Sequence, residues 1–278
     1  MNILITVLTC CIVVFLYLHI VYQLKTCDDL ELYEIDMPTK CKLEEICDLR
    51  QPILFAHEFK FDVTDYGAFD VNINDNTPTK IVLPLEKANE LFKKNTTYFS
   101  EHNAGFLRDT TLQKKYEAAD SILRPYMVSE MKYDLIFGSP STHTTLCYSN
   151  HYRNYYAVTQ GDITVKLTPP KNTKYLYPLV DYETQEYTSE VNPWNPDPKH
   201  TSVNKVKFLE VSVKQGQVIH VPAYWWYSIK LGSNSQIAVF RYRTYMNFVS
   251  VLPDICRGIL QRTNVTIKNI KPEEKIKY

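Results

Sequence analysis

The chain opens with a continuous apolar run. From Ile3 to Tyr22 no residue carries a formal charge, and before Tyr17 the polar side chains are only those of Thr6 and Thr9. As an α-helix, about 20 residues at 1.5 Å rise each reach roughly 30 Å, which is the thickness of the hydrocarbon core of a bilayer. We therefore expect residues 1–24 to be a transmembrane anchor that contacts lipid through residues 3–22.

A cleaved signal peptide and a buried core helix are the alternatives for this run. A signal peptide needs a basic start, a shorter apolar stretch of about 7–15 residues and small residues before the cut, and all three are missing here. A core helix of this length would normally carry a polar face. Tyr17 and Tyr22 near one end suit a membrane–water interface, so the pattern favours a single-pass, uncleaved anchor.

The side of the membrane on which the remaining chain lies depends on its flanking charges. No Lys or Arg precedes the apolar run, whereas basic residues follow it at Lys25, Lys40, Lys42 and Arg50. Positive residues tend to stay on the cytosolic side, so the pattern weakly favours a cytosolic domain. The cysteines beyond the run are odd in number and scattered, unlike a disulfide framework. Two sequons, at Asn95 and Asn264, would be glycosylated only in a lumenal domain.

After the anchor, composition divides the chain into a charged segment, one domain and a tail. Residues 25–50 mix both signs of charge and predict a stalk with a short helix near 43–49. Residues 51–262 are long enough for one well-buried core and short for two, and residues 263–278 form a C-terminal tail. The formal net charge is +0, so no basic field favours a nucleic-acid partner.

Within the domain, periodicity predicts helices before and after a β-rich region. Helical spacing of apolar residues predicts helices at 84–94, 111–123 and 248–261. Short apolar or alternating segments between turn residues predict strands, as in a sandwich or barrel. These strands are expected at 51–55, 79–83, 135–137, 144–148, 155–159, 163–167, 207–213, 218–221, 227–230 and 235–243. The fold class is therefore mainly β with flanking helices.

Three stretches of the β region carry a recognisable set of motifs. Residues 154–161 are an Asn followed by aromatic residues and a Gly, residues 167–170 end in Pro-Pro, and residues 216–226 hold a Gly turn, an apolar strand and Pro-Ala-Tyr-Trp-Trp. In order and spacing they resemble the JmjC-type or cupin-like jelly roll of Fe(II)/2-oxoglutarate oxygenases, especially the asparaginyl-hydroxylase-like branch. The resemblance spans roughly residues 40–250 and implies a double-stranded β-helix. Residues 152–154 and 191–194 also resemble cupin-like proteins of large DNA viruses.

The resemblance places the family's iron site on residues that do not suit iron. In the family, a His-x-Asp/Glu pair and a distant His hold the metal, and these positions fall on Tyr148, Asn150 and Tyr227. Neutral phenol and amide groups bind Fe(II) far more weakly than imidazole and carboxylate. We therefore assign no metal and no cofactor to this chain.

The cosubstrate pocket that the resemblance implies is altered as well. The position of the Lys that pairs with 2-oxoglutarate falls on Ile163, and Thr145 and Asn154 are the other positions of this vestigial pocket. An apolar side chain offers a buried carboxylate no partner, which costs several kcal/mol. If Tyr148, Asn150, Ile163 and Tyr227 converge inside one barrel, their side chains should fill the old cavity and hydrogen-bond to one another.

Other residues offer weaker possibilities. A rebuilt metal site would draw on His143, His151 and His220, with Asp134 or Glu183 as the carboxylate. Two arginines, Arg241 and Arg243, lie too late in the pattern for the cosubstrate, so we expect surface or interhelix pairing. The aromatic run 224–227 could be a ligand platform, although packing of the barrel is the simpler interpretation.

The sequence thus predicts a membrane-anchored, catalytically degenerate cupin-like domain, a pseudoenzyme that serves as a binding or structural module for an unknown protein partner. The alternative is a divergent Fe(II)/2-oxoglutarate-dependent hydroxylase with an unusual metal site. A common point shared by two imidazoles and a carboxylate inside the barrel would favour the alternative.

Overall fold

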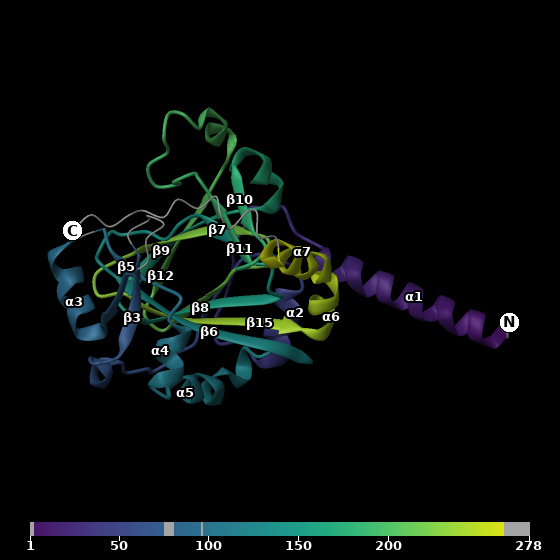
Figure 1. Cartoon of the computed structure of the whole chain (residues 1–278), viewed down its shortest axis with the longest axis horizontal. Helices are drawn as coiled ribbons and strands as arrows, with labels where there is room; N and C mark the ends of the chain where they lie inside the picture. Colours follow the sequence, from purple (N-terminus) through teal and green to yellow (C-terminus); the bar gives the residue numbers. More distant parts are fainter. Residues whose placement is uncertain (1–2, 75–80, 96, 264–278) are drawn as a thin grey trace.

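The computed structural model describes residues 3–74, 81–95 and 97–263. Its body is built on two β-sheets, with helices on the outside and one long helix projecting from one end (Figure 1). The helices are α1 (Ile3–Leu24), α2 (Lys40–Cys47), α3 (Leu85–Lys94), α4 (Ala104–Asp109), α5 (Leu112–Ala119), α6 (Tyr245–Ser250) and α7 (Leu252–Thr263). Short 3₁₀ turns lie at Thr64–Tyr66, Asp120–Ile122, Pro170–Tyr175 and Thr201–Lys205.

The larger sheet has nine strands in the order β1-β2-β13-β8-β15-β6-β5-β3-β4. All neighbours in it are antiparallel except β1 and β2, which are parallel. Its strands are β1 (Tyr33–Ile35), β2 (Ile53–Ala56), β3 (Asp70–Asn74), β4 (Ile81–Pro84), β5 (Phe99–Ser100), β6 (Val128–Gly138), β8 (Arg153–Gln160), β13 (Gln217–His220) and β15 (Gln236–Thr244).

The smaller sheet has six antiparallel strands in the order β10-β11-β7-β14-β9-β12. These are β7 (Cys147–Tyr148), β9 (Asp162–Thr168), β10 (Pro178–Asp181), β11 (Glu186–Ser189), β12 (Leu209–Lys214) and β14 (Trp226–Leu231). One face of each sheet contributes to a shared apolar cluster, in which Val239 and Tyr156 of the larger sheet join Val165 and Ile229 of the smaller one. This cluster is the interior of the jelly roll.

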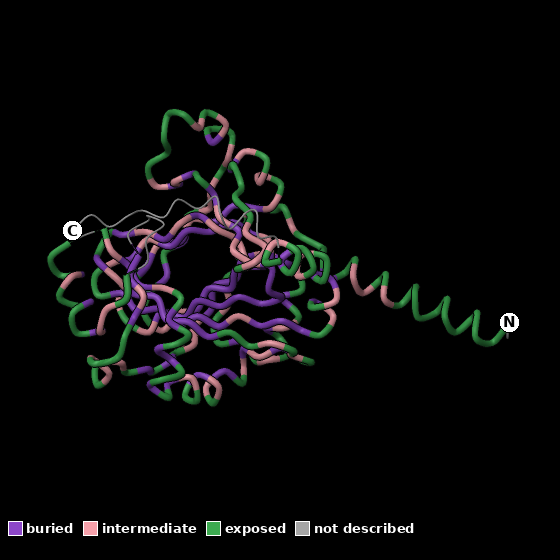
Figure 2. Tube along the Cα trace, in the orientation of Figure 1, coloured by how far each residue is buried: buried purple, intermediate pink, exposed green. Residues whose placement is uncertain are grey.

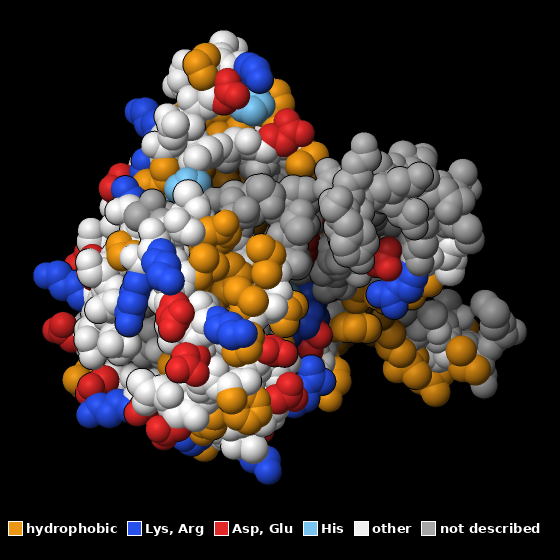
Figure 3. Space-filling view, turned by 60° about the vertical axis from the view of Figure 1, so that its left-hand side comes forward, with side chains coloured by type: hydrophobic (Ala, Val, Ile, Leu, Met, Phe, Trp, Pro, Cys, Tyr) orange, Lys and Arg blue, Asp and Glu red, His pale blue; other side chains and the backbone are white. Residues whose placement is uncertain are grey.

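A second apolar cluster covers the other face of the larger sheet, where Phe240 and Tyr155 meet Leu43 of α2, Phe92 of α3 and Tyr116 of α5. Alternate residues of β8 and β15 therefore serve two cores, as the two-residue period of a strand requires. Figure 2 shows the result, with buried residues along the strands of both sheets and an exposed α1. On the face drawn in Figure 3, Lys and Arg side chains are interspersed with Asp and Glu.

The predicted strands are largely present, with shifted ends. The final predicted helix is in fact two, because α6 ends before Pro253 and α7 begins at Leu252, where proline is tolerated in the first turn of a helix. The prediction at 144–148 is too long, since only Cys147 and Tyr148 pair as strand. Residues 79 and 80 of another predicted strand lie outside the described residues.

The prediction of a stalk at residues 25–50 is wrong. Tyr33–Ile35 pairs in parallel with β2 as β1, and α2 buries Leu43, Ile46 and Cys47 in the core of the domain. The predicted short helix exists, but it begins at Lys40 after an N-cap at Thr39, whose hydroxyl accepts a hydrogen bond from the Lys42 backbone amide. The many charged residues of this segment suggested that it is solvated. Its few apolar residues at helical spacing are nevertheless enough to attach it to the core of the domain.

Helix α1 is long and apolar enough to span a membrane, a property that an N-terminal signal sequence shares. Its last two turns rest on the domain. Residues 3–15 are all exposed, whereas Leu16, His19, Ile20 and Gln23 are partly or fully buried. Their spacing places them on one helical face, and α1 contacts α6 there.

A cation also joins α1 to the domain. The guanidinium of Arg50 lies 5.4 Å from the ring centre of Tyr22 and 4.8 Å from that of Tyr152. Arg50 is only 3% exposed. Cation–π contacts of this kind are stronger when the cation is desolvated. The end of α1 is therefore held against the domain by side-chain contacts as well as by the chain itself.

Candidate functional site

The interior of the jelly roll is where the family resemblance places metal chemistry. Strand β14 directs Tyr227, Ile229 and Leu231 into this interior, with Tyr227 directly opposite Cys147 of β7. The Tyr227 ring centre lies 5.1 Å from that of Tyr156, which projects from β8. Ile163 is 1% exposed in the same cluster. Tyr227 and Ile163 thus share the interior.

Tyr148 does not join them. Its ring stacks on Tyr187 with centres 4.6 Å apart, and it meets Trp226 edge-to-face at 4.8 Å, beside the apolar cluster behind the smaller sheet. Neighbouring residues of a strand point to opposite faces, so Cys147 faces Tyr227 and Tyr148 faces away. The predicted convergence of Tyr148 and Tyr227 in one cavity is therefore wrong.

Asn150 belongs to a third environment, a buried polar cluster. Its Oδ1 accepts a hydrogen bond of 3.0 Å from Nη2 of Arg243, and its Nδ2 donates one of 3.1 Å to the Tyr187 hydroxyl. Its backbone carbonyl accepts from Nδ2 of Asn247 at 3.4 Å. The amide thus joins β15, β11 and α6 in a structural role.

The remaining positions singled out in the sequence lie elsewhere in the fold. Asn154 is fully buried and its Nδ2 donates to the backbone carbonyls of His151 and Val221, at 3.3 and 3.2 Å. It therefore joins the start of β8 to the segment after β13. Thr145 is partly buried in the loop before β7. Asn95, the first sequon residue, is exposed after α3, whereas Asn264 lies outside the described residues.

Sequence reasoning missed the charged group of the interior, which is Arg241. The prediction of surface or interhelix pairing was wrong for both arginines, because β15 directs Arg241 and Arg243 toward the interior while Phe240 and Tyr242 face the helices. Arg241 lies within electrostatic reach of Tyr156, Tyr227 and Asp134. Arg243 is 1% exposed and donates from Nε to Glu130 at 3.1 Å. Strand parity was the signal that could have located both.

The interior groups keep their neutral or cationic forms at neutral pH. Burial raises the pKa of the Cys147 thiol to about 12, although hydrogen bonding to Tyr227 opposes the shift. Burial, with Cys147 and Tyr156 nearby, likewise raises the pKa of Tyr227 well above its ordinary value. Burial tends to lower the pKa of Arg241, but the neighbouring Tyr156, Tyr227 and Asp134 outweigh it and the net shift is upward. The site therefore offers a protonated thiol, two phenols and a cation.

The three histidines of a rebuilt site lie apart. His143 is hydrogen-bonded through Nε2 to Asn192 at 3.1 Å. Its backbone forms an isolated β-bridge with Lys230 of β14, whose side chain points away from the interior. His220 contacts Tyr155, with ring centres 5.0 Å apart, on the helix-covered face of the larger sheet. His151 bonds Ser149 through Nδ1 at 2.9 Å, and its Nε2 lies 3.8 Å from Glu130.

The two carboxylates considered for that site are engaged elsewhere. Asp134 accepts hydrogen bonds from the backbone amides of His102 and Asn103, at 3.0 and 2.6 Å, and Glu183 lies 3.6 Å from Arg262. Within residues 3–74, 81–95 and 97–263, no three His, Cys, Asp or Glu side chains are grouped to hold a metal ion. The residues at the family's positions do not fit Fe(II) and 2-oxoglutarate.

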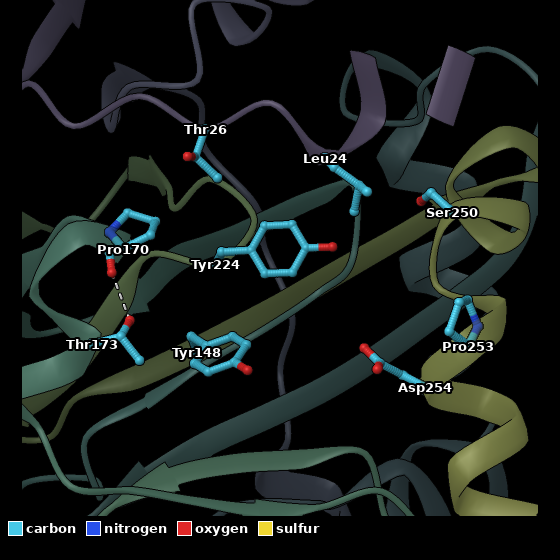
Figure 4. Close-up of a pocket in the computed structure, with 9 residues that line it drawn as sticks. All are labelled: Leu24, Thr26, Tyr148, Pro170, Thr173, Tyr224, Ser250, Pro253 and Asp254. Atoms are coloured by element: carbon cyan, nitrogen blue, oxygen red, sulfur yellow. Dashed lines mark hydrogen bonds between the residues drawn. The ribbon is translucent and has the colours of Figure 1, made fainter. Parts of the chain in front are cut away.

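Two cavities are lined by residues considered above. One, of about 420 Å³, lies beside α4 and is lined by the side chains of Arg241, Asp134, His102, Arg108 and Lys132, among others. The other, of about 410 Å³, lies at the base of α1. Figure 4 shows Tyr148, Tyr224 and Asp254 pointing into this second cavity, with Leu24 from α1 and Ser250 from α6 at its edge.

The tyrosines of the second cavity remain protonated at neutral pH. Burial and the neighbouring Asp254 raise the pKa of Tyr224 to about 12. The pKa of Tyr148 is raised by burial and by Tyr187 and Asp254. Tyr224 has a left-handed backbone, with φ of 67°, which a non-glycine residue rarely adopts. The cavity is thus an aromatic, hydroxyl-rich pocket next to α1.

The two-sheet jelly roll with an apolar and phenolic interior defines a cupin-type domain. Comparison with known proteins agrees on the class: the model of the cupin-like domain family matches residues 69–244, and the chain belongs to this family.

Curated relatives match a smaller part of the chain. HSPB1-associated protein 1 from Rattus norvegicus and from Homo sapiens are each 33% identical to it over 98 residues, which is 34% of this chain and 20% of theirs. The homologue from Danio rerio is 34% identical over 89 residues, or 31% of this chain and 20% of that protein. The chain therefore matches only about a fifth of the length of these relatives.

Proposed function

We propose that this chain is a membrane-anchored, catalytically degenerate cupin-like domain that acts as a binding module. The observation that carries the proposal is the chemistry of the barrel interior. There Tyr227 and Ile163, at two positions that the resemblance assigns to iron and 2-oxoglutarate, lie beside Cys147. A protonated thiol and phenols are poor ligands for Fe(II). Binding without oxidation is the function that these residues support best.

Membrane anchoring is supported by the way in which α1 joins the domain. A cleaved signal peptide has no reason to bury residues in the mature fold, whereas Gln23 is 6% exposed and Tyr22 contacts the buried Arg50. We propose that the domain lies on the cytosolic side of the membrane, because basic residues follow α1.

The partner is proposed to be a protein. The name of the mammalian relatives, HSPB1-associated protein 1, says that they associate with another protein, and this supports a protein partner for this chain. On the face drawn in Figure 3, Lys and Arg side chains are interspersed with Asp and Glu, and a mixed surface of this kind favours a protein over a nucleic acid as the partner. We also propose that the chain is related to cupin-like proteins of large DNA viruses, because residues 152–154 and 191–194 resemble them.

Two measurements test the lack of oxygenase chemistry. The full chain, purified in mild detergent, is expected to hold far less than one iron per chain by mass spectrometry after incubation with Fe(II), and to form no succinate from 2-oxoglutarate above a heat-denatured control. Stoichiometric iron, or succinate formation that scales with the protein, would establish the hydroxylase alternative instead.

Anchoring is tested separately. The N-terminal residues should be detected in the mature protein by intact mass, and the chain should stay in the membrane fraction at alkaline pH. Loss of the first 20 or so residues would identify α1 as a cleaved signal.

A further inference from the structure

A group of exposed apolar side chains surrounds the base of α1. Tyr245 and Phe248 of α6 are 57% and 44% exposed, and Leu252 at the start of α7 is 43% exposed. Tyr126 and Met127, which are 64% and 72% exposed, lie beside them, since the Tyr245 backbone amide donates to the Met127 carbonyl at 3.2 Å. We name these five residues the basal patch. The segment from Tyr245 to Pro253 carries no charged residue.

The basal patch lies next to the last turns of α1. Helix α6 contacts α1 directly, and Figure 1 shows α6 and α7 at the end of the domain from which α1 projects. Only residues 3–15 of α1 extend clear of the domain. At 1.5 Å per residue this free part is roughly 20 Å long, whereas a hydrocarbon core is roughly 30 Å thick. An inserted α1 therefore brings α6 to the depth of the membrane interface.

The chemistry of the patch suits that depth. Tyrosine favours the boundary between hydrocarbon and headgroups, and a short apolar helix face lying in that plane gains free energy from the area it buries. Lys40 lies with its ammonium 5.0 Å from the ring centre of Tyr126, and Lys25 directly follows α1. Both can meet lipid phosphates while the aromatic rings enter the interface.

From this geometry we infer that the basal patch is a second membrane contact, which seats the domain on the bilayer surface next to its own anchor. The inference rests on the proposed function, because it requires α1 to span the membrane. The occupant of the patch is the lipid interface, because the free part of α1 is too short to hold α6 away from it.

Tryptophan scanning in vesicles tests the inference. The full chain is reconstituted into phosphatidylcholine vesicles with and without brominated acyl chains, which quench only nearby indoles. Phe248→Trp probes the basal patch and Phe15→Trp probes α1. Val82→Trp is the matched control, because Val82 is 58% exposed on β4, which leads into α3 on the side of the domain away from α1 (Figure 1). The parent chain gives the background from its three tryptophans.

The expected result is that the added emission of Phe248→Trp is blue-shifted and at least half quenched by bromolipid, that Phe15→Trp is quenched more strongly, and that Val82→Trp is not quenched. If Phe15→Trp is quenched and Phe248→Trp behaves like Val82→Trp, the seating is overturned while the anchor stands. Blue-shifted but unquenched emission from Phe248→Trp would also overturn it, because a protein or a second copy would then cover the patch. An unquenched Phe15→Trp would overturn the anchor and the seating together.

Discussion

Asn150 provides the sharpest test of whether a position that the resemblance assigns to iron has a structural role. In Asn150→Ala, Nη2 of the buried Arg243 loses its 3.0 Å hydrogen bond and keeps only the longer one of 3.5 Å to Gln185, while Nη1 already has no hydrogen-bond partner among the described residues. A hydrogen bond to a charged group contributes about 1.5–3 kcal/mol to stability, and the neutral bond to Tyr187 about 0.5–1.5 kcal/mol. We therefore expect the free energy of unfolding to fall by about 2–4 kcal/mol.

The measurement is urea unfolding of the full chain in mild detergent, followed by the fluorescence of the buried Trp225 and Trp226. Two variants are the controls. Asn150→Asp keeps an acceptor toward Arg243 and should stay within about 1 kcal/mol of the parent. Asn195→Ala removes an exposed amide and should change stability by less than about 0.5 kcal/mol. If Asn150→Ala lost no more stability than Asn195→Ala, the structural role assigned to Asn150 would be wrong.

Three other predictions concern iron binding, the stability of the fold in acid and the side of the membrane. The triple variant Tyr148→His/Asn150→Asp/Tyr227→His should not bind Fe(II) stoichiometrically by mass spectrometry, because position 148 faces away from position 227; tight binding would refute the strand register at Cys147. His220 has a pKa well below its ordinary value, through burial and the nearby Arg153 and Arg50. Below about pH 6.5 the unfolded chain takes up a proton there and the folded chain does not, so the free energy of unfolding should fall on acidification by up to about 1.4 kcal/mol per pH unit. Urea titrations at pH 7 and pH 5.5 should show a smaller fall for His220→Phe, and equal falls would contradict this origin. In eukaryotic cells, Asn95 should stay unmodified if the domain is cytosolic, whereas a glycosidase-sensitive mass shift that Asn95→Gln abolishes would place the domain in the lumen.

The sequence predicted the strands that carry a long apolar or alternating run and missed several shorter strands. The predicted strands at 155–159 and 235–243 correspond to β8 and β15, because both faces of these strands are buried and their apolar residues run nearly without a break. Strands β1, β10 and β11 were missed, since strands of three or four residues carry little pattern. Helix α2 was predicted, but its attachment to the core was not.

The sequence indicated which segments of the chain form the candidate site, but it did not predict which way each side chain points. Counting from Asn154 back to Tyr148 crosses the irregular segment between β7 and β8, and strand parity does not carry through such a segment. Tyr227, by contrast, lies within the regular strand β14, and its interior position agreed with the prediction. The interior role of Arg241 follows from parity in β15, yet only the fold shows that Tyr156, Tyr227 and Asp134 surround it.

The attachment of α1 limits how far the domain can reach for a partner. A flexible stalk of about 25 residues would let the domain range over roughly 25–30 Å from the bilayer. Here the segment from Lys25 to Arg50 is folded onto the domain, and Arg50 lies between Tyr22 and Tyr152. If α1 spans the membrane as proposed, the domain therefore has a nearly fixed height and tilt. It would then select partners by the height of their epitope above the membrane plane, and it would meet them by lateral diffusion of the whole chain.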